Sequence, residues 1–386
     1  IMHLLIMKGK NCMKSVKFLL PLLLLCAVLF CGCTGKEEKK IDEVVKRELD
    51  LLKHLDSDTT QKYISYQEIF PGDLEDAAMS SDVEEVFSLF FQDFDYKILD
   101  ASVNRNKAIA KVSLRLFTLD ARALAEDFSK ALLKHEIALA ASDDTEDDQT
   151  VTLEDRYMLL NQLLSSNKYQ TVERNCSITL TASEKNEETI WEIKRTTTLE
   201  NDLVGGLMNY LSDPDILSPE DTLLVYLDTL KNMSTEELAN YLNADSIVST
   251  EDPNKISLAN ALVEQVHNIF NYSIGETSVS GYHASVKADI TTFDSEAILN
   301  SYQSQLDDYL SSTDAVIDGA QKRYDKSYQL LIDSIKENKE EKTVTTTFTL
   351  INDGASWKLE DAGSVFGQAL FGTLSSSPVE DSEEDS

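Results

Sequence analysis

The sequence predicts an α+β fold made of two tandem copies of one domain, in which helices pack on a curved antiparallel sheet, preceded by a leader peptide that is cleaved. Short motifs recur in the same order in the two halves of the chain. Within each half, apolar residues have helical spacing first and strand-like alternation later. The leader is an apolar run that is too short to span a membrane comfortably and that follows a basic segment.

The recurring motifs indicate two whole domains, because their period is far longer than that of a solenoid repeat. They are Leu49-Asp50-x-Leu52-Lys53 and Leu227-Asp228-x-Leu230-Lys231, Phe94-x-Tyr96-x-Ile98 and Phe270-x-Tyr272-x-Ile274, Arg156-Tyr157 and Arg323-Tyr324, and Trp191-Glu192-Ile193 and Trp357-Lys358-Leu359. The predicted domains are residues 41–212 and 219–372, joined by a Pro- and Asp-containing linker at 213–218. The acidic segment 373–386 is predicted to be a disordered tail.

Each copy is expected to begin with helices and to continue into a pair of strands. A first helix with an apolar stripe is followed by a second, at about 83–91 in one copy and 258–270 in the other. The two strands are predicted at about 96–103 and 108–117 in the first copy, and at 272–279 and 284–293 in the second.

The remainder of each copy is predicted to hold two helices, a hairpin and a closing helix. Asp120 and Asp294 are placed to cap the first of these helices, and the Arg-Tyr motif lies on the next. The hairpins are expected at 169–181 with 189–198, and at 343–351 with 356–359. A closing helix that contains Gly205-Gly206 or Gly367 ends each copy.

The leader resembles the lipobox of bacterial lipoproteins, in which a cysteine after a small residue is acylated and becomes the mature N-terminus. Gly32 and Cys33 carry this resemblance, and Phe30 departs from the usual leucine. The resemblance implies a signal peptide at 1–32, cleavage between Gly32 and Cys33, a lipid-anchored linker at 33–40, and a location on the extracytoplasmic face of the cell membrane. Residues 1–12 are expected to be an upstream extension, since Met13 directly precedes the basic segment. A membrane anchor that is retained uncleaved is the alternative.

Charge and cysteine content narrow the classes of partner and of chemistry. The formal net charge of −33 repels phosphates, so nucleic acid is excluded as a partner. After cleavage only Cys33 and Cys176 remain, and acylation of Cys33 leaves Cys176 without a disulfide partner. Cys176 lies on the mostly apolar face of a predicted strand, which favours packing, although Arg174 on that face leaves a nucleophilic role open. No metal, phosphate-binding or nucleophile motif is present, so neither a metal nor a cofactor is expected.

The order of elements, ending in a Trp-x-Ile or Trp-x-Leu strand, resembles the nuclear transport factor 2-like (cystatin-like) superfamily. In particular it resembles tandem lipoproteins of unknown function from Gram-positive bacteria, over about residues 41–372. The helical pair between the middle strands departs from the simplest form of that fold. The superfamily includes enzymes that use a carboxylate in an apolar cone as a general base, and such a base needs a raised pKa.

Six residues are candidates for a site in such a cone. Asp100 and Glu276 are the carboxylates, because they share strand parity with Tyr96 and Tyr272. The duplicated aromatic residues either fill the core or line a ligand cavity, and they are Tyr96, Trp191, Tyr272 and Trp357.

The sequence favours a lipid-anchored, non-catalytic protein that binds or scaffolds an unidentified protein, peptide or small molecule outside the membrane. Two alternatives remain open. One is an isomerase- or hydrolase-like enzyme that uses Asp100 or Glu276 in a pocket, and the other is an envelope chaperone or small-ligand receptor.

A Cys33→Ser variant is expected to keep its leader and to carry no lipid, because the thiol is the group that is acylated. Mass spectrometry of the N-terminus checks this, and the unsubstituted protein should begin at a lipidated Cys33. Cys31→Ser is the matched control and should be processed normally, since bulky Phe30 precedes Cys31. Unchanged processing of the Cys33→Ser variant, or of the protein in globomycin-treated cells, would contradict the prediction.

Overall fold

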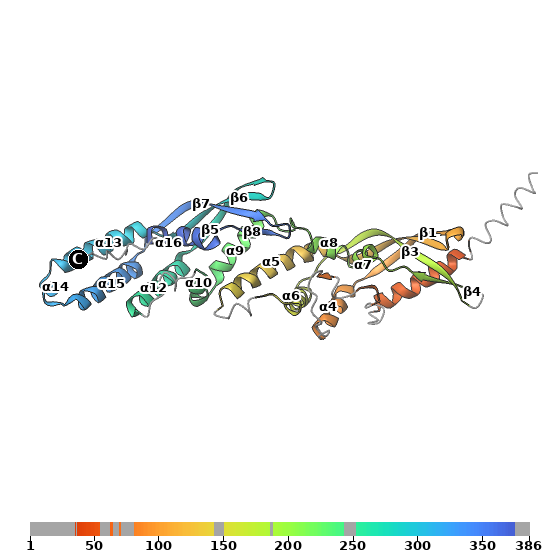
Figure 1. The fold of residues 1–386 in the computed structure, drawn as a ribbon, viewed down its shortest axis with the longest axis horizontal. Coiled ribbons are helices and arrows are strands. Elements are labelled where there is room, and N and C mark those ends of the chain that lie inside the picture. Colours follow the sequence, from red (N-terminus) through yellow and green to blue (C-terminus); the bar gives the residue numbers. More distant parts are fainter. Residues whose placement is uncertain are drawn as a thin grey trace, which may run out of the picture. The chain divides into compact units, whose positions relative to one another are not determined.

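The computed structural model describes residue 35 and residues 37–54, 62–64, 69–70, 81–142, 150–185, 188–242 and 252–374. The predicted α+β class is confirmed: helices accompany two four-stranded antiparallel sheets (Figure 1). The chain forms two compact units. Of the described residues, unit 1 holds those up to Leu124 together with Asn161–Asn209, and unit 2 holds Ala125–Leu160 together with those from Tyr210 on.

The first sheet is formed by strands β1 to β4, which pair in sequence order. The strands are β1 (Asp95–Asn104), β2 (Ile109–Leu119), β3 (Thr171–Lys185) and β4 (Glu188–Ile193). A helix over residues 37–53 and α4 (Ser81–Phe91) precede them, the short 3-10 helix η1 (Arg105–Lys107) joins β1 to β2, and α7 (Thr197–Leu203) and α8 (Leu207–Leu211) follow. Along β2, Val112, Leu114 and Leu116 are buried while Lys111 and Ser113 face solvent, so period-two alternation places one face of the sheet on the core.

Helices α5 (Ala121–Ala140) and α6 (Leu153–Ser166) lie between β2 and β3 in the sequence. They correspond in chain order to the helices that separate the middle strands of the second sheet. From Ala125 to Leu160 they belong to unit 2, where Ile137 and Ala141 are part of the buried apolar core.

The second sheet repeats the strand order of the first, β5-β6-β7-β8. Its strands are β5 (Asn271–Ser280), β6 (His283–Phe293), β7 (Glu341–Asn352) and β8 (Trp357–Leu359). The helices of this half are α9 (Pro219–Asn232), α10 (Thr235–Tyr241), α12 (Pro253–Ile269), α13 (Ser295–Leu310), α14 (Thr313–Ile317), α15 (Ala320–Glu337) and α16 (Ala362–Phe371), and η3 (Gly372–Leu374) follows.

Helix starts follow the capping chemistry that the sequence predicts. The carboxylate of Asp294 accepts hydrogen bonds from the backbone N–H groups of Glu296 and Ala297, and Asp120 accepts one from Ala123. Both predicted caps are confirmed. Ser218 caps α9 and Pro219 occupies its first turn, where the missing proline N–H costs nothing.

One predicted strand is too long. The sequence favoured extended structure through residue 198, but β4 ends at Ile193 and α7 begins at Thr197. The Thr196 hydroxyl accepts the N–H of Leu199, so a threonine that suits a strand acts instead as a helix cap.

Gly372 and Gly281 of unit 2 both adopt positive φ, but in different surroundings. Gly372 has φ 56° and ψ −128°, and a Cβ there would lie 2.6 Å from the Oγ of buried Ser295. Gly281, in the turn between β5 and β6, has φ 62° and open space around it. A residue with a Cβ would be strained by the positive φ at both positions, but it would overlap a neighbouring atom only at Gly372.

We therefore expect Gly372→Ala to destabilise unit 2 by roughly 3 kcal/mol and Gly281→Ala by about 1 kcal/mol. Urea unfolding of the two variants, compared with the unsubstituted chain, measures the difference. Equal losses would show that Ser295 moves aside at no cost.

Candidate functional site

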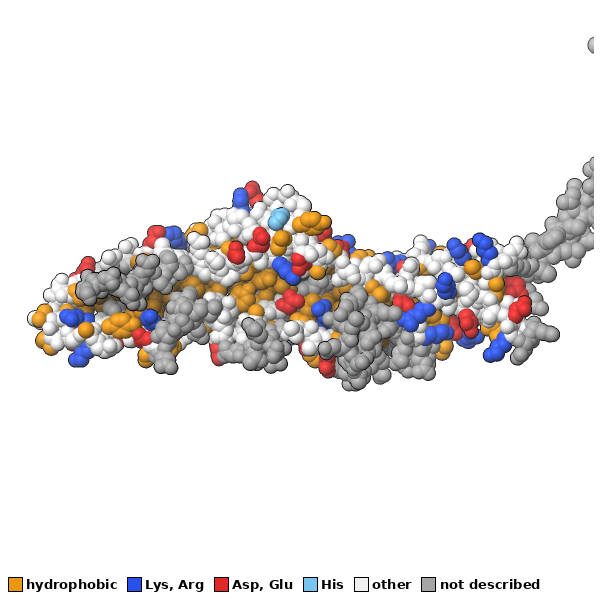
Figure 2. Space-filling model, in the orientation of Figure 1, with side chains coloured by type: hydrophobic (Ala, Val, Ile, Leu, Met, Phe, Trp, Pro, Cys, Tyr) orange, Lys and Arg blue, Asp and Glu red, His pale blue; other side chains and the backbone are white. Residues whose placement is uncertain are grey.

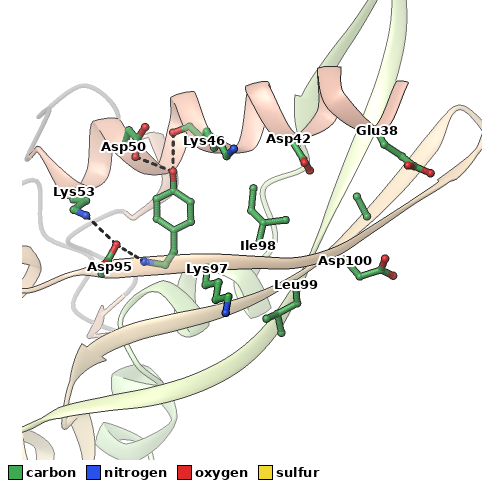
Figure 3. Close-up of a pocket in the computed structure, with 12 residues that line it drawn as sticks. Glu38, Asp42, Lys46, Asp50, Lys53, Asp95, Lys97, Ile98, Leu99 and Asp100 are labelled. Atoms are coloured by element: carbon green, nitrogen blue, oxygen red, sulfur yellow. Dashed lines mark hydrogen bonds and ion pairs between the residues drawn. The ribbon is translucent and has the colours of Figure 1, made fainter. Parts of the chain in front are cut away.

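A groove of about 660 Å³ lies in unit 1 between helix 37–53 and strand β1. Figure 3 shows Ile98 pointing from the strand toward the helix, whereas Lys97 and Leu99 lie on the other side of the strand. Five carboxylates and three lysines are among the residues that line the groove. The lining residues are Glu38, Asp42, Lys46, Asp50, Lys53, Asp95, Tyr96, Lys97, Ile98, Leu99, Asp100 and Ala101.

Tyr96 ties the strand to the helix at one end of the groove. Its hydroxyl donates to Asp50 Oδ1 at 2.8 Å and lies 3.3 Å from the backbone oxygen of Lys46. Burial and the Asp50 carboxylate raise the pKa of the Tyr96 phenol, so it remains a neutral hydrogen-bond donor.

An ion pair lies beside that tyrosine. Lys53 Nζ is 2.9 Å from Asp95 Oδ1, and the same oxygen accepts the backbone N–H of Tyr96. The bond from Lys53 holds the pKa of Asp95 below its usual value. The carboxylates of Asp50 and Asp95 therefore already have donors at this end of the groove.

Unit 2 repeats this arrangement. The Tyr272 hydroxyl donates to Asp228, and Lys231 Nζ donates to Asn271 Oδ1 at 2.9 Å. Burial, followed by the effect of Asp228, raises the pKa of Tyr272. In both units the tyrosine thus fastens the first helix of the copy to the first strand of the sheet.

The duplicated tryptophans make a second fastening in each unit. Trp191 Nε1 donates to Glu37 Oε2 at 3.3 Å, and Trp357 Nε1 donates to Asp215 Oδ1 at 2.9 Å. Both indoles are otherwise buried. Tyr96, Trp191 and Tyr272 therefore hold helix and sheet together, whereas Trp357 holds the sheet to the turn that precedes α9. Of these four candidates, Tyr96 also lines the groove.

The other end of the groove carries three carboxylates without partners among the described residues. Figure 3 shows Glu38 and Asp42 on the helix and Asp100 on β1 at this end. None of the three carboxylates has an ion pair or hydrogen bond to another residue that the structure describes. Asp42 Oδ1 is also buried, which is costly for an oxygen without a donor.

The expected strand parity of Asp100 and Glu276 is wrong, because a β-bulge lies just before Asp100 and another includes Glu276. The register of β1 shifts between Ile98 and Asp100, and that of β5 shifts between Ile274 and Thr277. An extra residue reverses the alternation of side chains beyond it. Both carboxylates are exposed as a result and do not follow Ile98 and Ile274 toward the helix.

Glu276 also lacks the electrostatic property that a general base needs. It pairs with Lys287 at 2.9 Å, and this bond lowers the pKa of the Glu276 carboxyl. A catalytic base at neutral pH requires a shift in the opposite direction. The geometry therefore does not favour Glu276 as a base.

Cys176 lies half-buried on β3, with side chains alternating as the sequence predicts. Burial raises the pKa of its thiol to about 12; Asp202 adds to this effect and Arg174 opposes it. The thiolate, the reactive form, is accordingly disfavoured at neutral pH. This environment favours packing over nucleophilic chemistry.

Several other expectations concern the two ends of the chain or metal binding. Gly32 and Cys33 lie outside the described residues, as does the acidic segment beyond residue 374. Within the described ranges, no helix combines the length and apolar character needed to cross a bilayer. Over the same ranges, no group of three or more His, Cys, Asp or Glu side chains is placed to hold a metal ion.

Comparisons with known proteins give a structural neighbour but no family. No protein-family model and no curated protein sequence matches the chain. The crystal structure of a candidate lipoprotein from Bacillus subtilis matches with 15% sequence identity, over 72% of this chain and 96% of that chain, with a TM-score of 0.28. A TM-score this low does not establish a common fold, so nothing is carried over from that protein.

Sequence reasoning found the aromatic residues of these contacts but not their partners. Asp50 and Lys53 were visible as part of a repeated motif, yet nothing local pointed to Tyr96 or Asp95. Glu37 and Asp215 stood in segments predicted to be linkers. The sequence marks Glu37 and Asp215 only by their position: both precede the aspartate of the repeated Leu-Asp motif by the same number of residues.

We expect Cys176 to react with a thiol reagent at pH 8 at least tenfold more slowly in the folded protein than in urea, because its raised pKa leaves little thiolate. A Cys176→Ala/Ser177→Cys variant is the matched control, since Ser177 is exposed on the same strand. Both measurements use the chain expressed from residue 34 onward, in which position 176 or position 177 carries the single thiol, and a colorimetric reagent such as DTNB. Equal rates in the folded proteins for Cys176 and for the thiol introduced at position 177 would refute the prediction.

Proposed function

We propose that this protein is a lipid-anchored, non-catalytic binding module on the extracytoplasmic face of the cell membrane. We further propose that the groove of unit 1 binds a ligand that carries a positively charged amine. The three carboxylates of Glu38, Asp42 and Asp100 at one end of the groove carry this proposal.

The leader supports the proposed location on the extracytoplasmic face of the cell membrane. A basic segment, a short apolar run and Gly32 before Cys33 are the parts that export and acylation need. The Cys33→Ser substitution described above tests this location independently of any ligand.

The charge of the groove supports the class of ligand. Carboxylates without partners are acceptors that an ammonium group can satisfy, and charge-assisted hydrogen bonds of this kind are stronger than neutral ones. The high negative charge of the whole chain would also steer cations toward it. A volume of about 660 Å³ falls within the range of small-ligand sites.

The two copies differ where a specific ligand would bind. Counting from the shared Leu-Asp motif, Glu38 and Lys46 of unit 1 correspond to Ile216 and Leu224 of unit 2. The aromatic contacts are kept, and Asp42 and Asp100 remain acidic as Glu220 and Glu276, but the carboxylate of Glu38 and the charge of Lys46 are lost in unit 2. This difference favours recognition by unit 1 alone.

We also propose that both units belong to the nuclear transport factor 2-like superfamily. The identical strand order of the two sheets supports this relation, and the helices between the second and third strands are a departure from the family. An experimental structure of unit 2 that fails to superpose on any member of the superfamily with a TM-score of 0.5 would refute it.

The groove is tested with spermidine and trilysine as probes, by isothermal titration calorimetry at two salt concentrations. A Glu38→Gln/Asp42→Asn/Asp100→Asn variant should bind at least tenfold more weakly, because one charged hydrogen bond contributes about 1.5–3 kcal/mol and tenfold corresponds to about 1.4 kcal/mol.

The matched control changes unit 2 at corresponding positions, as Glu220→Gln/Glu276→Gln, and should bind like the unsubstituted chain. Equal weakening in both variants would indicate attraction by the overall charge only. If neither probe binds to the unsubstituted chain, the proposal of an amine ligand is refuted. The proposed location on the cell membrane would not be affected.

A further inference from the structure

The end of the α13–α14–α15 hairpin in unit 2 exposes three large aliphatic side chains. Leu310 is 53% exposed, Val316 is 82% exposed and Ile317 is 80% exposed. Figure 2 shows hydrophobic side chains on the surface at this end of unit 2, where Figure 1 places α14. Val316 and Ile317 are adjacent in sequence and both face water, which indicates a contact surface rather than a chance exposure.

This end of the hairpin has a defined conformation. The Ser312 hydroxyl caps α14 by accepting the N–H of Ala315, and the Tyr309 hydroxyl donates to Asp318 Oδ2 at 3.0 Å. Arg323 Nη1 donates to the backbone oxygen of Ala315 at 3.3 Å. Val316 and Ile317 are therefore presented from a fixed turn, which lowers the entropy lost on binding.

The other helical hairpin of the chain shows what such an end can do. Helices α5 and α6 follow β2 as α13 to α15 follow β6, so the two hairpins hold the same place in the order of elements. At the far end of α5, Ile137 is 3% exposed and Ala141 is 1% exposed, and both lie in the apolar core of unit 2. The end of a hairpin thus completes the core of a unit that follows it in sequence.

We propose that the hairpin end formed by Leu310, Val316 and Ile317 docks on unit 1 of a second copy of this chain. Unit 1 is the counterpart of the unit that receives the end of α5, and the contact would repeat that packing between molecules. Donor and acceptor surfaces differ in such a contact, so it joins copies head to tail and extends into chains of molecules.

Asp314, beside Val316, would be repelled by an anionic membrane, which disfavours a lipid surface as the partner. Asp318 on the other side is already paired with Lys322, at 3.7 Å. The proposal does not depend on the groove or on its ligand.

Site-specific photo-crosslinking in living cells tests the contact with the full, anchored chain. The photoreactive amino acid p-benzoylphenylalanine replaces Ile317, and in the control it replaces Tyr282, which is exposed in the β5–β6 turn of the same unit. We expect a ladder of covalent multimers from position 317 and at least tenfold less from position 282. Mass spectrometry should locate the crosslinked peptide in unit 1.

A Leu310→Asp/Val316→Asp change in the crosslinking chain should abolish the ladder, and Val279→Asp is its matched control. All three positions are exposed, and thermal unfolding verifies that the variants remain folded. Crosslinks to lipid, to another protein or between two hairpin ends would overturn the proposal. So would the absence of multimers from position 317.

Discussion

A tyrosine hydroxyl bonded to a helix aspartate joins the helical layer to the sheet in both units. In unit 1 the bond runs from Tyr96 to Asp50, and in unit 2 from Tyr272 to Asp228. The tyrosines lie on β1 and β5, the outermost strands of their sheets, where no neighbouring strand restrains one side. A hydrogen bond to a carboxylate is among the stronger kinds, so it fixes the distance between helix and strand at this edge. The groove of unit 1 exists because that distance is held.

The bulge after Ile98 gives the same edge a second property. A strand with regular alternation would direct Asp100 toward the helix. The inserted residue instead leaves Asp100 and the bulge residue Leu99 exposed at the rim. The equivalent bulge in β5 leaves Glu276 beside Lys287. One irregularity of the backbone therefore sets whether these carboxylates resemble catalytic bases or surface acceptors, and in both units the geometry favours acceptors.

What could be predicted from the sequence was local. Asp120 and Asp294 could be read as helix caps because a cap needs only its own next residues, and the apolar alternation of β2 reveals which face is buried. Thr196 was misread because a threonine suits both a strand and a cap, and only the start of α7 decides between them. The bulges depend on two residues facing one residue of the neighbouring strand, and no single strand contains that information.

Long-range contacts escaped prediction for a related reason. The helical period of α5 indicates that Ile137 is on an apolar stripe, but it does not identify the core that covers the stripe. The same limit applies to the pairs of Trp191 with Glu37 and of Trp357 with Asp215, whose members are far apart in sequence.

Duplication explains how the two copies can differ in surface while sharing an interior. The contacts that join helix to sheet recur with chemically similar partners, such as Asp95 and Asn271 opposite the repeated lysine. Residues beside them are free to change because they contribute little to packing, and Lys46 in one copy corresponds to Leu224 in the other. A loss of packing at the shared contacts would affect the fold of its unit, whereas a change at the groove or at the hairpin end affects only what that surface can bind. Binding specificity can therefore diverge between copies without a cost in stability, which is why the functional differences of this chain are expected at its unshared surface residues.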